Sequence, residues 1–143
     1  MKINYQFTPA DFSKIMKKMA ADYEKEITEA IAVATHQTSY NAKSFAPVDK
    51  AGLKSSIRPI IKGMTGEIIV GAEYGPYQEF GTGSKVQVPS ELSSYAMQFK
   101  GRGIRQVNTR AQPYLYPAFF LQRDKFVSDM NNRINKIGNK NWR

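Results

Sequence analysis

The sequence predicts an α+β fold in which a small antiparallel sheet lies between two long helices along the chain. Apolar residues recur at three- and four-residue steps over residues 9–43 and again over residues 116–137, as they do on one face of a helix. Between them stand β-branched runs bounded by glycines, which are typical of strands. A chain of 143 residues is long enough for one core, so we expect a single domain over residues 1–143.

The first helix is expected over residues 9–43, with Thr8 as N-cap, Pro9 at a position that needs no N–H, and Asp11 in the first turn. Its apolar stripe comprises Phe12, Ile15, Met16, Met19, Tyr23, Ile27, Ala30, Ile31 and Ala34. Its polar stripe comprises Lys14, Lys18, Asp22, Lys25, Glu29 and His36. Such a helix is roughly 50 Å long, more than a small domain's diameter, so we expect part of it to pack on another subunit.

A sheet of about three to four strands is expected over residues 55–88. Residues 55–61 predict an edge strand, because Pro59 lacks the N–H that an interior strand donates. A turn at residues 63–66 and a regular strand at residues 67–71 complete a hairpin.

A second turn is predicted at residues 74–77, and residues 85–88 alternate polar and apolar like a half-buried strand. Residues 83–111 form a long basic insertion in which we expect a short helix. Its proposed cap is Ser90, its apolar face is Leu92, Tyr95 and Phe99, and its end is Gly101.

The C-terminal helix is expected over residues 116–137 and is predicted to stop at Gly138. Its apolar positions are Phe120, Val127, Met130, Ile134 and Ile137.

The formal net charge of +9 is concentrated in the C-terminal half of the chain. Residues 1–80 carry ten basic and nine acidic side chains, whereas residues 81–143 carry eleven basic and three acidic ones. Two interpretations stay open for Lys100, Arg102, Arg105 and Arg110: a solvated basic loop, or contacts with the phosphate backbone of DNA.

No catalytic residue, metal site or cofactor is predicted. The chain has no cysteine, which excludes disulfides, zinc thiolates and cysteine nucleophiles. The single histidine, His36, falls on a polar helix stripe, and no segment has the arrangement of a nucleophile elbow. The central acids are scattered, and residues 81–85 lack the spacing of a phosphate-binding loop. Without a membrane-spanning run or a signal peptide, we expect a cytoplasmic protein with no membrane partner.

Three short segments stand out by their order and spacing. Residues 46–57 contain Ala-Pro-Val-Asp followed, after Lys50 and Ala51, by Gly-Leu-Lys-Ser-Ser-Ile. Residues 70–82 lead from Val-Gly-Ala through two tyrosines to Glu-Phe-Gly-Thr, and residues 112–119 are Gln-Pro-Tyr-Leu-Tyr-Pro-Ala-Phe. Together they resemble the head-tail joining, or tail-completion, proteins in the neck of siphophages and prophages. The insertion is longer than in the family pattern, as is the turn that contains Lys50 and Ala51.

The resemblance marks six residues as motif and interface candidates: Glu79, Phe80, Gly81, Thr82, Pro113 and Leu115. Two interpretations of this motif are weighed. As scaffold, Gly81 allows a tight turn after a buried Phe80, Thr82 bonds the turn, and Glu79 accepts from exposed N–H groups. As an interface, Glu79 meets the basic half of a neighbouring subunit.

The function implied by the resemblance is that of a non-enzymatic virion component, made in the host cytoplasm, that joins the filled head to the tail. Its implied partners are copies of itself in a ring, the head-closure or connector protein, the tail-terminator protein, and DNA touched without sequence preference in the channel. The alternative is a small basic DNA-binding protein, and a small hydrolase or nuclease is a third possibility.

Overall fold

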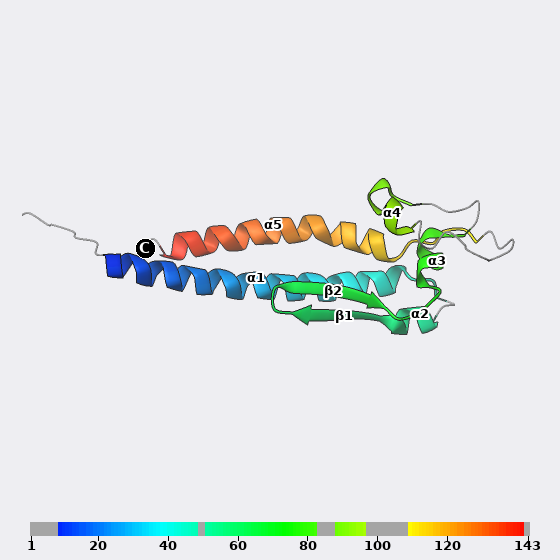
Figure 1. Cartoon of the computed structure of the whole chain (residues 1–143), viewed down its shortest axis with the longest axis horizontal. Helices are drawn as coiled ribbons and strands as arrows, with labels where there is room; N and C mark the ends of the chain where they lie inside the picture. Colours follow the sequence, from blue (N-terminus) through cyan, green and yellow to red (C-terminus); the bar gives the residue numbers. More distant parts are fainter. Residues whose placement is uncertain (1–8, 49–50, 83–87, 97–108, 142–143) are drawn as a thin grey trace, which may run out of the picture.

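The computed structural model describes residues 9–48, 51–82, 88–96 and 109–141. Within these ranges the fold is α+β, with a long N-terminal helix, a two-stranded antiparallel hairpin and a C-terminal helix packed against the first (Figure 1). The predicted fold class is confirmed at this level.

The two long helices lie side by side and antiparallel (Figure 1). α1 spans Pro9–Phe45 and ends just before Pro47, close to the predicted boundary. α5 spans Leu115–Asn141, so the predicted stop at Gly138 is wrong. A glycine inside a helix costs only about 1 kcal/mol. The buried Ile137 directly before it keeps this turn packed.

The hairpin follows a short helix that the sequence did not predict. α2 spans Ala51–Ser56, β1 spans Ile57–Lys62 and β2 spans Thr65–Val70. β1 therefore begins two residues later than the strand predicted at residues 55–61. Ser55 and Ser56 belong to the last turn of α2, where their hydroxyls donate hydrogen bonds to the carbonyls of residues 52 and 53.

The register of the hairpin pairs Lys62 with Thr65 across a two-residue turn in which Gly63 has a φ of 55°. Such a turn requires the flanking pair to exchange hydrogen bonds, so alternate pairs from there inward are hydrogen-bonded. Pro59 pairs with Ile68 in a non-bonded pair, and its nitrogen faces outward. The prediction of an edge strand at Pro59 is thus confirmed.

The remaining elements lie near the open end of the hairpin (Figure 1). The turn predicted at residues 74–77 is instead the start of α3, Gly75–Phe80. The expected short helix is present as a 3₁₀ turn, η2 (Ser90–Leu92), followed by α4 (Ser93–Ala96). Ser90 lies inside the first of these turns and does not cap it. Val88 is not in a strand, and the rest of the predicted strand lies outside the described residues.

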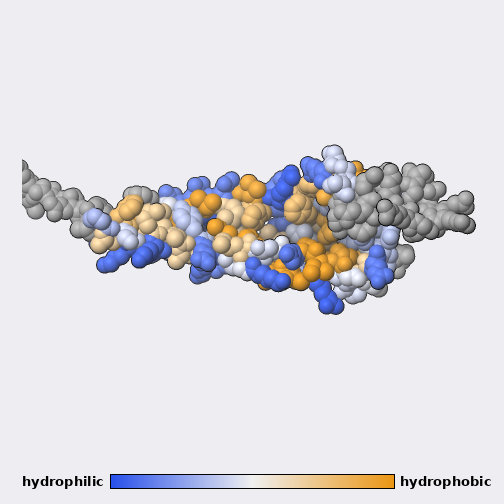
Figure 2. Space-filling model, viewed as in Figure 1, coloured by the Kyte–Doolittle hydropathy of each residue, from blue (hydrophilic) through white to orange (hydrophobic). Residues whose placement is uncertain are grey.

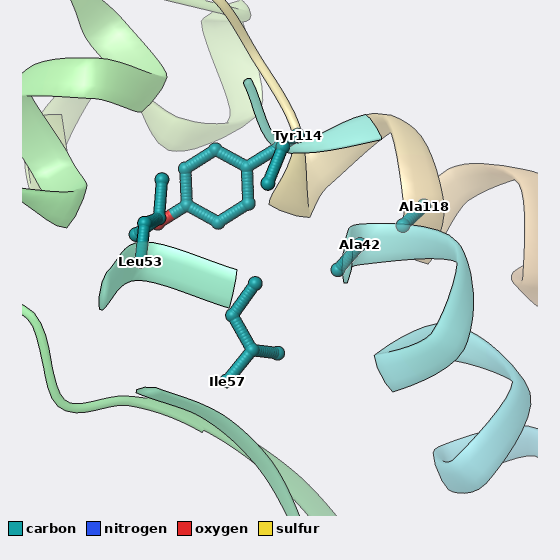
Figure 3. Packing of buried hydrophobic residues seen from close by; sticks show 6 residues of the cluster. Ala42, Leu53, Ile57, Tyr114 and Ala118 are labelled. Atoms are coloured by element: carbon teal, nitrogen blue, oxygen red, sulfur yellow. The ribbon is translucent and has the colours of Figure 1, made fainter. Parts of the chain in front are cut away.

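The core lies where α1, α2, β1 and α5 meet (Figure 3). Leu53, Ile57 and Tyr114 are its largest fully buried side chains, each stabilising the fold by roughly 1.5–3 kcal/mol. Ala42 and Ala118 are also fully buried, and their small side chains let the two long helices approach closely at this point.

The apolar stripe predicted for α1 is wrong at its N-terminal end. Phe12 is 58% exposed and Met16 48% exposed. Elsewhere on the stripe, Ile15, Met19, Tyr23 and Ile27 are half-buried and Ala30 is buried, as predicted. Four buried positions of α1 were not predicted: Thr35, Thr38, Ser39 and Ala42. Thr35 and Thr38 can be buried because their hydroxyls donate to the carbonyl oxygens of Ile31 and Ala34 at 2.7 and 2.8 Å.

Candidate functional site

The predicted motif residues meet at the N-terminus of α5. The Glu79 carboxylate, on α3, accepts three backbone N–H groups: those of Tyr114 and Leu115 at 2.8 Å each and that of Tyr116 at 2.7 Å. Glu79 is only 3% exposed. A negative charge at a helix N-terminus is favoured by the unpaired N–H groups and the helix dipole.

This single side chain completes the first turn of α5. A helix leaves its first four N–H groups without intrahelical acceptors. Here Glu79 binds three of them, and the fourth position is Pro117, which has no N–H. The Glu in the second segment and the second proline in the third segment therefore serve one structural purpose, the capping of α5.

Two further contacts fasten the same joint. Gln78 and Gln112 bond through their side chains at 2.6 Å, and the Gln112 N–H donates to the Gln78 carbonyl at 2.9 Å. Thr82 and Thr109 form a second pair, in which the Thr82 N–H donates to the Thr109 carbonyl and the Thr82 hydroxyl accepts from the Thr109 N–H. We call residues 78–82 and 109–116 the capping joint.

Gly81 has the backbone that the sequence analysis expected. Its φ of 76° lies in the left-handed region that favours glycine, and its N–H closes α3 on the Tyr77 carbonyl at 2.9 Å. Phe80 beside it is 5% exposed. The structural interpretation of Glu79, Phe80, Gly81 and Thr82 thus has a concrete geometry, while Pro113 and Leu115 are half-buried at the start of α5. Their role at a subunit interface stays a prediction.

Of the candidate DNA contacts, only Arg110 lies in the described part of the chain, where it is exposed next to the capping joint. Lys100, Arg102 and Arg105 lie outside the described residues. His36 is exposed on α1, as its place on the polar stripe predicts.

An ion-pair cluster that the sequence analysis missed joins the two long helices far from the capping joint. Arg133 on α5 bonds Glu26 on α1 and Asp129 on its own helix, each at 2.7 Å, and approaches Glu29 at 3.9 Å. Hydrogen bonds to Asp129 and Glu26 raise the pKa of Arg133 above its ordinary value. The four-residue spacing of Asp129 and Arg133 could have indicated an ion pair within α5. The ion pair with Glu26 could not be predicted, because it depends on how α1 and α5 pack.

An open apolar groove of about 1030 Å³ lies between α1, β2 and α5. Its floor is α1, with Ile31, Ala34, Thr35 and Thr38, and one side is β2. The opposite wall comes from α5, with Tyr116, Phe119, Phe120, Gln122 and Phe126 among its residues. Figure 2 shows hydrophobic surface gathered over the hairpin, next to this groove. We call it the β2 groove.

Within the described ranges, no three acidic or histidine side chains gather in a way that could hold a metal ion. No described helix is both long and apolar enough to cross a bilayer. Comparison with known proteins found no matching family model, no similar curated protein and no similar solved structure.

Proposed function

We propose that this chain is a non-enzymatic structural subunit of a phage neck, which assembles with copies of itself into a ring and joins the DNA-filled head to the tail. In this role it docks between the head-closure or connector protein and the tail-terminator protein, and it becomes part of the virion. No turnover is required.

The observation that carries the proposal is the apolar surface left on both long helices. On α1 it includes Phe12, Met16, Val33 and Tyr40, and on α5 it includes Phe119, Leu121, Val127 and Ile134, each between 41% and 69% exposed. Phe12 and Met16 lie one helical turn apart, and apolar surface that is contiguous is typical of faces that contact other proteins. A two-helix layer with apolar residues on several sides suits a subunit that is completed by its neighbours.

The capping joint supplies the rigidity that a docking subunit needs. The second and third segments of the family resemblance meet there through hydrogen bonds over 34 to 37 residues of sequence. The first segment contributes Leu53 and Ile57 to the adjoining core. All three segments therefore support one rigid end of the molecule, in agreement with the resemblance on which the proposal rests.

DNA binding is the second candidate, favoured by the basic C-terminal half. On α5, however, Arg133 is already bound to three carboxylates, and Arg123 lies 3.5 Å from Asp124 and over the Phe120 ring. This pairing lowers the positive charge that α5 offers to phosphates. Tight binding of DNA by the isolated chain, weakening steeply with salt, would favour this candidate.

The test of the joining role is deletion of the gene from the phage or prophage that carries it, with electron microscopy of the lysate. We expect separate filled heads and finished tails, which unite when the purified chain is added back. Intact infectious particles in the deletion lysate would rule the joining role out.

A further inference from the structure

In the described part of the chain, the free edge of β2 has no hydrogen-bond partner where it borders the β2 groove. In the hairpin register, Gly66, Ile68 and Val70 belong to non-hydrogen-bonded pairs, so their N–H and C=O groups point away from β1. The groove lining includes these three residues and none from β1, which places this edge on the groove side. Within the described residues, no hydrogen bond reaches these groups.

The two edges of the hairpin differ in their ability to pair with a further strand, and the difference favours β2. β1 contains Pro59, whose outward-facing nitrogen offers no N–H, together with the charged Arg58 and Lys62. Prolines and charges of this kind protect an edge against further pairing. β2 has the sequence Thr-Gly-Glu-Ile-Ile-Val and contains no proline and a single charge. It is the edge that can accept another strand.

The groove beside this edge suits an extended peptide more than a compact ligand. Its volume of about 1030 Å³ is at the upper limit of small-molecule pockets, which span roughly 300–1,000 Å³. Gln122 on the α5 wall is 9% exposed, and its side-chain oxygen has no donor in the described part of the chain. A peptide supplies both the apolar side chains for the walls and backbone N–H groups for β2 and Gln122.

A peptide of this pattern is present at the start of the chain. Residues 2–7 are Lys-Ile-Asn-Tyr-Gln-Phe, in which Ile3, Tyr5 and Phe7 alternate with polar residues. Strict alternation is the pattern of a strand with one apolar face. These residues lie outside the described ranges and are joined to α1 at Pro9.

The arm cannot fill the groove of its own chain. The groove floor begins at Ile31, which is about 33 Å along α1 from Pro9 at 1.5 Å per residue. A fully extended arm from Pro9 back to Lys2 covers only about 24 Å. An arm of this length reaches the β2 edge only from another copy.

We propose, on the basis of the ring suggested above, that residues 2–7 of one copy add as a third strand to β2 of the next. Ile3, Tyr5 and Phe7 enter the β2 groove, and Lys2, Asn4 and Gln6 face solvent on the side of Glu67. The contact is heterologous, because an arm meets a groove, and it links copies in series.

The test uses disulfide capture between introduced cysteines. The sequence has no native cysteine that could form a competing disulfide. A synthetic peptide of residues 1–8 carrying Asn4→Cys is added in excess to the full chain carrying Glu67→Cys, in buffer whose dissolved oxygen takes up the two electrons released when two thiols form a disulfide. The matched control is Arg58→Cys, an exposed position on β1 that lies on the same face of the hairpin. An added strand lies about 4.8 Å from β2 and about 10 Å from β1.

We expect about tenfold more peptide adduct at position 67 than at position 58, because a disulfide requires Cα atoms within about 7 Å. A peptide that also carries Tyr5→Asp should lose this preference. Equal capture at the two positions, or capture at neither, would overturn the proposal. The peptide replaces the neighbouring copy, so this result is independent of ring formation and of the gene-deletion outcome.

Discussion

Different kinds of interaction stabilise the two ends of the molecule. At the capping joint, three elements converge on buried Tyr114, and a buried carboxylate holds the start of α5. At the other end, residues 9–29 of α1 and 124–141 of α5 form a helix pair that no third described element covers (Figure 1). We call this end the distal pair. Its clearest cross-helix link is the partly exposed Arg133 cluster.

The two ends are therefore expected to serve different purposes: one stabilises the fold, and the other contacts neighbouring subunits. Burial of apolar side chains and of hydrogen-bonded charge at the capping joint stabilises the isolated chain. A partly exposed ion pair contributes little in water. The exposed apolar residues of the distal pair, such as Phe12 and Met16, also gain little until something covers them. Substitutions at the capping joint should therefore reduce stability, whereas those on the distal pair should act on association.

The largest expected effect is that of Glu79→Gln. An amide retains one oxygen acceptor, but its NH₂ group faces backbone N–H groups that the carboxylate bound. Each buried N–H left without an acceptor costs about 1–3 kcal/mol, so we expect a loss of about 3 kcal/mol or more in the free energy of unfolding. Urea denaturation followed by circular dichroism measures it. Glu73→Gln, an exposed position nearby, is the control, and equal midpoints for both variants would contradict the capping role.

The next largest effect is expected at Gly66, where β2 approaches α1. A Cβ there would overlap the Thr35 hydroxyl oxygen, which is itself bonded to the Ile31 carbonyl. Overpacking of this kind costs about 1–3 kcal/mol, so Gly66→Ala should lower the melting temperature.

Gly138→Ala is the matched control for that experiment, since no atom lies within 4 Å of the added Cβ. Alanine is the better helix former by about 1 kcal/mol, so this variant should melt at a higher temperature. If both substitutions shift the melting temperature in the same direction, the close approach of Gly66 to α1 is wrong.

A smaller effect is expected for Arg133→Met in the distal pair. The Arg133 side chain is 23% exposed and its partners are 36–52% exposed, so solvent screens the pairs. We expect a loss of about 1 kcal/mol or less at low salt. The loss should shrink in 1 M NaCl, where the Debye length is about 3 Å. A loss that does not respond to salt would mean that the arginine acts through packing of its aliphatic stem.

Local sequence signals predicted the elements whose causes are local. The long helices followed from apolar periodicity, and Pro59 marked an edge because a missing N–H is a property of the residue itself. The tight turn that the scaffold interpretation gave to Gly81 agrees with its φ of 76°. α3 was missed because Gly75 and Pro76 are typical of turns, whereas here the proline occupies the first turn of a helix.

Features that depend on distant partners could not be predicted in detail. That Glu79 accepts N–H groups was predicted, but its donors lie 35 to 37 residues away and the sequence did not identify them. The apolar stripe of α1 was correct at Ala30 but wrong at Phe12 and Met16, for a related reason. Periodicity shows which residues share a face, but not whether another element covers that face, and α1 extends beyond the elements that could bury Phe12.

The smallest effect on stability, and the most informative contrast, is expected for Phe12→Ser together with Met16→Ser. Both side chains are about half exposed on the distal pair, so their replacement should change the free energy of unfolding by about 0.5 kcal/mol or less. If the distal pair is a docking face, the same variant should fail to unite heads and tails when added to a deletion lysate. Ser13→Ala, on the same exposed helical turn, is the control for both measurements. A variant that unfolds easily would mean that Phe12 and Met16 stabilise the isolated chain, and one that joins heads to tails normally would remove this face from the assembly.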